Sequence, residues 1–134
     1  AQLLKSDATW KIAVFHFPPY NGKEPYLNIQ EEWVPIFDKY HVDLVFGGHF
    51  HYYMRSKPLN NGNVVNSFKE GTTYVISLGI PGRKVVLDNE PYAAVTEHNG
   101  WLYQHIKIDG KKLDFQSINF DGNLIDRFEI VKDK

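Results

Sequence analysis

Two histidines separated by one residue, His49 and His51, are the side chains of this sequence best placed to do chemistry. They follow an apolar run at 42–46 and a glycine pair, Gly47 and Gly48. On an extended backbone, residues two apart point to the same side with Cα atoms about 6.5 Å apart, so both imidazoles can lean toward one volume. The glycines permit a positive φ and a close backbone approach. This pattern indicates a metal site at the end of a buried strand.

The context of these histidines decides how much the pattern means. A histidine after a strand is most often an ordinary turn or hydrogen-bonding residue, and a spacing of two alone is weak evidence for a metal. A buried apolar run followed by two glycines and then paired imidazoles is more specific. We therefore treat His49 and His51 as candidate metal ligands.

A third histidine, His16, is expected beside this pair. The segment 10–15, WKIAVF, is aromatic and branched and predicts a short buried strand that His16 directly follows. A helix at 28–40 would join this strand to the one at 42–46, and such a crossover makes the two strands parallel. Parallel strands end at the same sheet edge, where ligands bind in open α/β sheets. The three histidines should converge there.

The connecting helix is predicted from a cap and an apolar face. It follows a proline-containing loop at 17–27, and Asn28 should be its N-cap with Glu31 as capping-box partner. Pro35 removes an amide donor, so we expect it to bend or restart the helix. The apolar residues at helical spacing, which should form the buried face, are Ile29, Trp33, Ile36, Phe37 and Tyr40.

The second half of the chain is predicted to be antiparallel sheet. It should contain a hairpin around 60–62, a strand at 72–79 with a turn at 80–84, and one helical turn after Pro91. No repeat or linker divides the chain, so we expect one domain of the α/β class with a mixed α+β sheet. Three closing strands are expected at 101–108, 112–120 and 124–130, joined by hairpins at Asp109-Gly110 and Asp121-Gly122.

Composition excludes several classes of partner. The chain has 134 residues, 43% of them hydrophobic, and 15 basic against 16 acidic side chains give a net charge of −1. No basic run tracks phosphates, so nucleic acid is not the expected partner. No apolar run approaches the roughly 18 residues of a membrane helix, and no membrane partner is expected. The absence of cysteine rules out disulfides and thiolate metal sites.

At His16 and at GGHFH (47–51) the sequence resembles the C-terminal half of the calcineurin-like metallophosphoesterases, and within them the purple acid phosphatases. The segment VFHFPPY (14–20) resembles that family's strand, histidine and proline-tyrosine loop. VDLVFGGHFHYYMR (42–55) is similar to its strand leading into G-H-x-H, tyrosine and arginine. TTYVISLGIPGRK (72–84) resembles the strand and glycine turn that follow. The resemblance covers most of the chain from Trp10.

The resemblance implies a partial αββα sandwich, with an N-terminal βαβ unit followed by antiparallel strands. It implies two metal ions, iron, zinc or manganese, that activate a water for hydrolysis of a phosphoester substrate. By motif match, His16 and His49 would be ligands of the second ion and His51 of the first. The resemblance favours secretion or a periplasmic location.

The sequence also departs from the family. No Gly-Asp pair and no Gly-Asn-His occurs in 1–134, so the carboxylates and the asparagine-histidine pair of the family's earlier motifs are missing. Met54 stands where purple acid phosphatases usually carry a glutamate, and the loop after Pro18 lacks paired histidines. We therefore expect residues 1–134 to be the C-terminal part of a single domain and to be inactive alone. An uncovered sheet edge would then allow a homodimer.

Other readings remain open. The chain could be a non-catalytic binding or structural module with the same fold, or a single-metal site with three histidines and an open fourth position. Upstream Gly-Asp and Gly-Asn-His motifs would favour the enzyme over the module. The remaining histidines, His41, His98 and His105, are expected to be structural.

Overall fold

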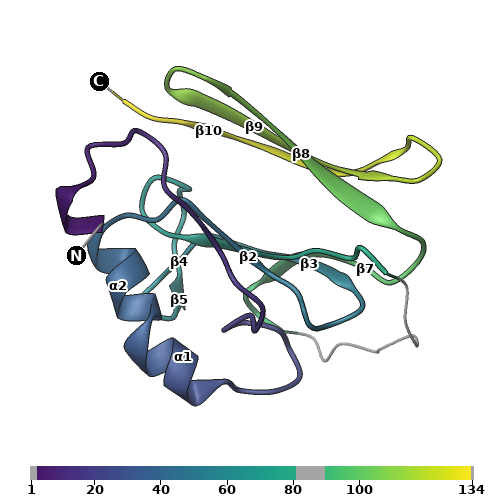
Figure 1. Ribbon diagram of the computed structural model, residues 1–134, viewed down its shortest axis with the longest axis horizontal. Helices are drawn as coiled ribbons and strands as arrows, with labels where there is room; N and C mark the ends of the chain where they lie inside the picture. The colour runs from purple at the N-terminus through teal and green to yellow at the C-terminus, as the bar shows by residue number, and fades with distance from the viewer. Residues whose placement is uncertain (1–2, 81–89, 134) are drawn as a thin grey trace.

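The computed structural model describes residues 3–80 and 90–133, and these form three layers. A mixed sheet lies between a pair of short helices and an antiparallel three-stranded sheet (Figure 1). The expected α/β class with a mixed sheet is confirmed. The strands of the mixed sheet, in spatial order, are β1 (Ile12–Val14), β2 (Leu44–Gly47), β6 (Thr73–Ile76), β3 (Tyr53–Ser56) and β7 (Ala93–Glu97).

The crossover at the start of the chain forms as predicted. Strands β1 and β2 are parallel, with Ile12 opposite Leu44, and β2 is in turn parallel to β6. The connection runs through two helices, α1 (Leu27–Glu32) and α2 (Val34–Lys39), in place of one. Pro35 lies in the first turn of α2, so the predicted restart of the helix at this proline is confirmed.

The details of the helix start and of its buried face differ from the prediction. The backbone amides of Ile29 and Gln30 both donate to the Tyr26 carbonyl, so the helix begins before Asn28 and no side chain caps it. The restart also breaks the expected continuous apolar face, because two short helices do not share one register. Val34 and Phe37 are buried, whereas Trp33 is 44% exposed and Ile36 is 45% exposed.

Two strands of the mixed sheet were not predicted. Strand β3 lies antiparallel between β6 and β7, and β7 occupies the position where a helical turn after Pro91 was expected. Both are short, and their hydrogen-bond partners lie far away in sequence, so local patterns identify them poorly. The hairpin predicted at 60–62 is confirmed, with β4 (Leu59–Asn60) and β5 (Asn63–Val64) joined at Asn61 and Gly62. Most of the turn predicted at 80–84 lies outside the described residues.

The closing strands form the second sheet. The strands are β8 (Leu102–Asp109), β9 (Lys112–Asn119) and β10 (Leu124–Val131), in the spatial order β10-β9-β8. Gly110 and Gly122 have φ of 53° and 83°, as the two predicted hairpins require. This sheet packs across the mixed sheet (Figure 1), and the core between them contains Leu44, Tyr53, Val75, Leu78, Leu102, Leu113, Phe115, Phe128 and Ile130.

Strand β1 forms one edge of the mixed sheet and leaves apolar side chains uncovered. Among the described strands β1 pairs with β2 alone, and Val14 is 76% exposed. Strand β8 is likewise an edge of the other sheet. In the part of the chain that the structure describes, no helix has the length and apolar character needed to cross a membrane.

Candidate functional site

His16 and His49 meet at the carboxyl ends of β1 and β2. Nε2 of His16 lies 3.2 Å from Nδ1 of His49, with the ring centroids 5.1 Å apart. The two segments are joined by a backbone hydrogen bond of 2.9 Å, in which the Gly48 amide donates to the His16 carbonyl. Two nitrogens held about 2.1 Å from one ion at angles near 90–110° would be roughly 3.0–3.4 Å apart. The spacing of these two nitrogens therefore fits two ligands of one metal ion.

The backbone that presents His49 is strained. His49 has φ of 65°, and the Phe50 amide donates to the Gly48 carbonyl at 2.7 Å, which closes a three-residue turn around His49. Such turns are rare for residues with a side chain and persist where the surroundings enforce them. The glycines permit a positive φ, but the structure assigns it to His49 and to neither Gly47 nor Gly48.

Gly47 is required because the backbone approaches another segment closely there, as the sequence predicted for the glycine pair. A Cβ added at Gly47 would lie 2.6 Å from Cβ of Pro18, in the loop that follows His16. A Cβ at Gly48 would lie 3.6 Å from Nδ1 of His16, an ordinary contact. The close backbone approach expected at the glycine pair thus occurs at Gly47, and it brings the two histidine-bearing segments together.

His51 is exposed and stands apart from the other two histidines. Among residues 3–80 and 90–133, no hydrogen bond or ring contact joins it to His16 or His49. The same residues contain no group of three or more histidine, aspartate or glutamate side chains placed to hold a metal. The structure thus brings together two of the three predicted ligands.

Aromatic rings surround the imidazole of His49. The ring centroid of Phe17 lies 4.7 Å away, that of Phe50 5.0 Å away and that of Tyr26 6.3 Å away. These rings restrict the orientation of the imidazole, although His16 and His49 are both exposed to solvent. No spacing pattern in the sequence identifies Phe17 or Tyr26, because both come from the irregular loop between β1 and α1.

This loop is fixed by Asn21, a buried residue with 1% exposure. Its Nδ2 donates to the carbonyls of Pro18 and Glu24, and its Oδ1 accepts from the amides of Lys23 and Glu24. The hydroxyl of Tyr52 donates to the Asn21 carbonyl. Burial raises the pKa of Tyr52, so its hydroxyl stays a donor at neutral pH. The loop is therefore ordered, and it is anchored next to the histidine turn.

An open hollow of about 520 Å³ adjoins His16 on the side of the three-stranded sheet. Ser77, which follows β6, and Gln104 of β8 reach into it. Neither residue was singled out from the sequence, since a lone serine and a lone glutamine carry no motif. Its full lining is Val14, Phe15, His16, Phe46, Gly47, Gly48, Ser77 and Gln104.

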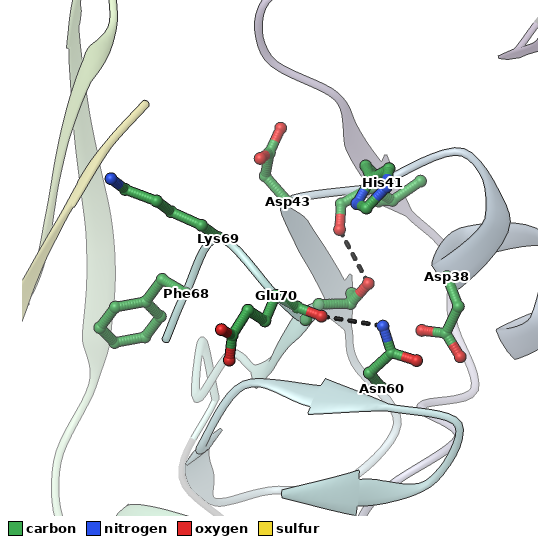
Figure 2. A pocket seen from close by; sticks show the side chains of 10 residues that line it. Asp38, His41, Asp43, Asn60, Phe68, Lys69 and Glu70 are labelled. Atoms are coloured by element: carbon green, nitrogen blue, oxygen red, sulfur yellow. Dashed lines mark hydrogen bonds between the residues drawn. The ribbon is translucent and has the colours of Figure 1, made fainter. Parts of the chain in front are cut away.

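A second, polar hollow lies at the opposite end of β2 (Figure 2). It measures about 20 Å³, which is room for about one water molecule. Asp43 at its rim accepts a hydrogen bond from the Lys11 amide at 2.8 Å and pairs with Nζ of Lys132 at 2.7 Å, so its carboxylate faces away from the histidines. Oδ1 of Asp38 is buried without a partner among the described residues. The hollow is too small for a substrate.

The remaining histidines lie away from His16 and His49. His41, at the end of α2, lines the hollow of Figure 2. His105 is exposed on β8 opposite Gln116, and His98 packs with its ring 5.8 Å from that of Tyr52. These placements agree with structural roles.

Comparison with known proteins identifies what this arrangement resembles. A family model described as calcineurin-like phosphoesterase matches residues 1–53, which include all three candidate histidines. An uncharacterized protein of Mycobacterium tuberculosis is 61% identical over 60 residues, covering 40% of this chain and 11% of that protein. Purple acid phosphatase 1 of Ipomoea batatas is 38% identical over 69 residues, covering 47% of this chain and 15% of that protein.

A solved structure matches over nearly the whole chain. The purple acid phosphatase from yellow lupin (Lupinus luteus) seeds superposes with a TM-score of 0.81 at 20% identity, covering 98% of this chain and 27% of that one. The likeness confirms the fold. The chain thus spans less than a third of each of these relatives.

Proposed function

We propose that this chain, which resembles the calcineurin-like phosphoesterases and the purple acid phosphatases, supplies the histidine side of a two-metal centre that hydrolyses phosphoesters. The observation that carries the proposal is the 3.2 Å separation of His16 Nε2 and His49 Nδ1 at the carboxyl edge of the sheet. In this proposal, His16 and His49 are ligands of one ion and His51 is a ligand of the other.

The donor set is consistent with this chemistry. Neutral imidazole nitrogens suit iron, zinc or manganese. Bound metal ions would polarise the phosphoryl oxygens and lower the pKa of a water that attacks the phosphorus. The chain's own residues hold and orient the imidazoles: the turn around His49 aims its ring at His16, and Phe17, Phe50 and Tyr26 limit its rotation.

The described residues do not complete such a centre. They offer two converging nitrogens and a separate His51, with no carboxylate grouped with them. A two-metal site needs further ligands, and bridging carboxylates are the usual ones. We propose that residues 1–134 form the C-terminal part of a single domain whose other part supplies them, and that the chain alone lacks phosphatase activity.

Two further proposals follow from the family and the fold. The purple acid phosphatase resemblance favours an exported protein, secreted or periplasmic. The edge of β1, with Val14 76% exposed, favours a homodimer of the isolated chain, because an unpaired strand is a template for a second copy.

Substitution of His49 tests the function in the full-length protein that contains this chain. His49→Ala should remove a metal ligand and lower turnover of p-nitrophenyl phosphate by about 100-fold or more, with a loss of bound metal measured by elemental analysis. His105→Ala, an exposed histidine on β8, is the matched control and should leave both unchanged. Unchanged activity and metal content in His49→Ala would refute the assignment.

A further inference from the structure

A polar network in two parts, one buried and one half-buried, joins the two sheets on either side of the histidine turn. Its first part is an ion pair between β3 and β10. Nε and Nη2 of Arg55 lie 2.6 Å and 3.0 Å from the two carboxylate oxygens of Asp126, and the Tyr53 hydroxyl donates to Oδ2 of Asp126 at 2.7 Å. Arg55 and Asp126 are 9% and 6% exposed. Residues that follow the histidine turn are therefore fixed to the last strand of the chain.

The second part of the network holds the segment that precedes the turn. The Ser77 amide donates to the Gly47 carbonyl at 3.2 Å, and the Ser77 hydroxyl donates to Oε1 of Gln104 at 2.5 Å. Nε2 of Gln104 donates to the hydroxyl of Ser117 on β9 at 3.3 Å. Gly47, at the end of β2, is thereby connected to the three-stranded sheet through two side chains.

The two parts hold opposite sides of the histidine turn. Ser117, which ends the second part on β9, is fully buried. Burial is the main cause of a raised pKa of Tyr53, and the neighbouring Asp126 carboxylate raises it further, so this hydroxyl remains protonated and able to donate. The two parts therefore bracket residues 48–52, one acting at Gly47 and the other at Tyr53 and Arg55.

A buried ion pair is an unfavourable way to fill a core, because removing its two charges from water costs free energy. The surrounding side chains, Leu44, Val75, Phe115 and Phe128 among them, are apolar, and apolar replacements of a buried ion pair are often neutral or stabilising. What directional hydrogen bonds add is a defined geometry. The turn that they bracket contains His49 at a φ of 65°, a conformation that persists only when its surroundings enforce it.

We propose that Gln104 and Asp126 are positioning residues that hold the histidine turn so that the imidazole of His49 stays beside His16. Gln104 acts through Ser77 on Gly47, and Asp126 acts through Tyr53 and Arg55 on the strand after the turn. The inference that Gln104 and Asp126 order the turn depends only on the contacts described above. The inference that they also affect metal binding rests on the proposed function.

The test compares variants of the full-length protein that contains this chain. Gln104→Met keeps the shape of the side chain and removes its polar atoms, and Asp126→Asn keeps an acceptor and removes the charge. Ile130→Val removes one methylene from the same core, where Ile130 is 1% exposed, and leaves the network intact. Hydrogen exchange of a peptide covering 48–52 is measured by mass spectrometry, together with thermal midpoints and zinc binding by calorimetry.

In Gln104→Met we expect hydrogen exchange at 48–52 to become roughly tenfold faster and zinc binding to weaken by a similar factor. The control Ile130→Val should lower the thermal midpoint to a similar extent and leave exchange at 48–52 unchanged. Wild-type exchange at 48–52 in a folded Gln104→Met variant would overturn the proposal. Faster exchange in a protein whose zinc binding is insensitive to both Gln104→Met and His49→Ala would uphold the positioning role and refute the metal site. Asp126→Asn, where it folds, should reproduce Gln104→Met.

Discussion

Gly47 packs so closely against Pro18 that a Cβ at Gly47 would lie 2.6 Å from the Cβ of Pro18, a distance that real Cβ atoms essentially never show. Both residues are buried, and both flank the histidines of the site. Gly47 does not have a positive φ, so the requirement for glycine is one of space and not of backbone conformation. This contact fixes how near the segment after β1 comes to the end of β2.

Gly47→Ala should therefore destabilise the protein by about 1–3 kcal/mol, the usual cost of forcing an extra methyl into a packed interior. It should also push the His16 segment away from His49. Gly48→Ala is the control, because its Cβ would make an ordinary contact at 3.6 Å with His16 Nδ1. Urea denaturation of both variants measures the difference, and equal losses would show that the segment at Pro18 yields easily.

The Arg55–Asp126 pair gives a second prediction. Asp126→Ala should cost about 3–5 kcal/mol, because it leaves the Arg55 guanidinium buried without its partner. The double variant Arg55→Met with Asp126→Leu should lose less free energy of unfolding than the sum of the losses in the single variants Arg55→Met and Asp126→Leu, since no unpaired charge remains. A double-mutant cycle from denaturation curves checks this. Additive losses would mean that the two residues contribute independently.

The carboxyl of Asp38 gives a pH-dependent prediction. Burial raises its pKa, against smaller opposing effects of the hydrogen bond from the Asn61 amide and of nearby His41. The folded state therefore holds this proton more tightly than the unfolded chain, and between the unfolded and folded pKa values its contribution to stability falls as the pH rises. Asp38→Asn removes this loss and retains an acceptor for Asn61.

Relative to wild type, Asp38→Asn should gain stability on going from about pH 3, below the ordinary pKa of aspartate, to about pH 7. Denaturation at both pH values measures the change. A gain of the same size at both would mean that ionisation of Asp38 has no part in it.

The isolated 134-residue chain should lack phosphatase activity and should bind at most one ion weakly, because its described residues offer two converging imidazoles and no grouped carboxylate. Calorimetric titration with zinc gives the stoichiometry and affinity, and p-nitrophenyl phosphate with zinc, manganese or iron tests turnover. Robust turnover that disappears in His49→Ala would contradict this expectation.

The isolated chain should also self-associate through the edge of β1. Val14 is 76% exposed and Ile12 is 40% exposed on this edge. Val14→Lys should weaken the association, because a charge at a strand edge opposes pairing with a second copy. Light scattering at micromolar concentration should show a mass above 15.6 kDa for the wild type. A monomer independent of concentration would show that the edge needs no cover.

The sequence was informative where a feature depends on residues close together in the chain. The Asp109-Gly110 and Asp121-Gly122 hairpins and the restart at Pro35 each follow from the backbone preferences of one or two residues. The same holds for the end of β1 at His16 and the end of β2 near His49, which a crossover of this length brings to one edge. The fold class and the meeting of these two histidines could therefore be predicted.

Tertiary structure decided what depends on contacts between distant segments. Residues 53–56 form a strand because β6 and β7 lie on either side, and no local pattern specifies those partners. The turn that gives His49 its positive φ directs it toward His16 and leaves His51 apart, although the two are separated by a single residue. Hydrophobic periodicity determines which face of an element is buried, whereas the direction of a strained turn is set by the packing around it.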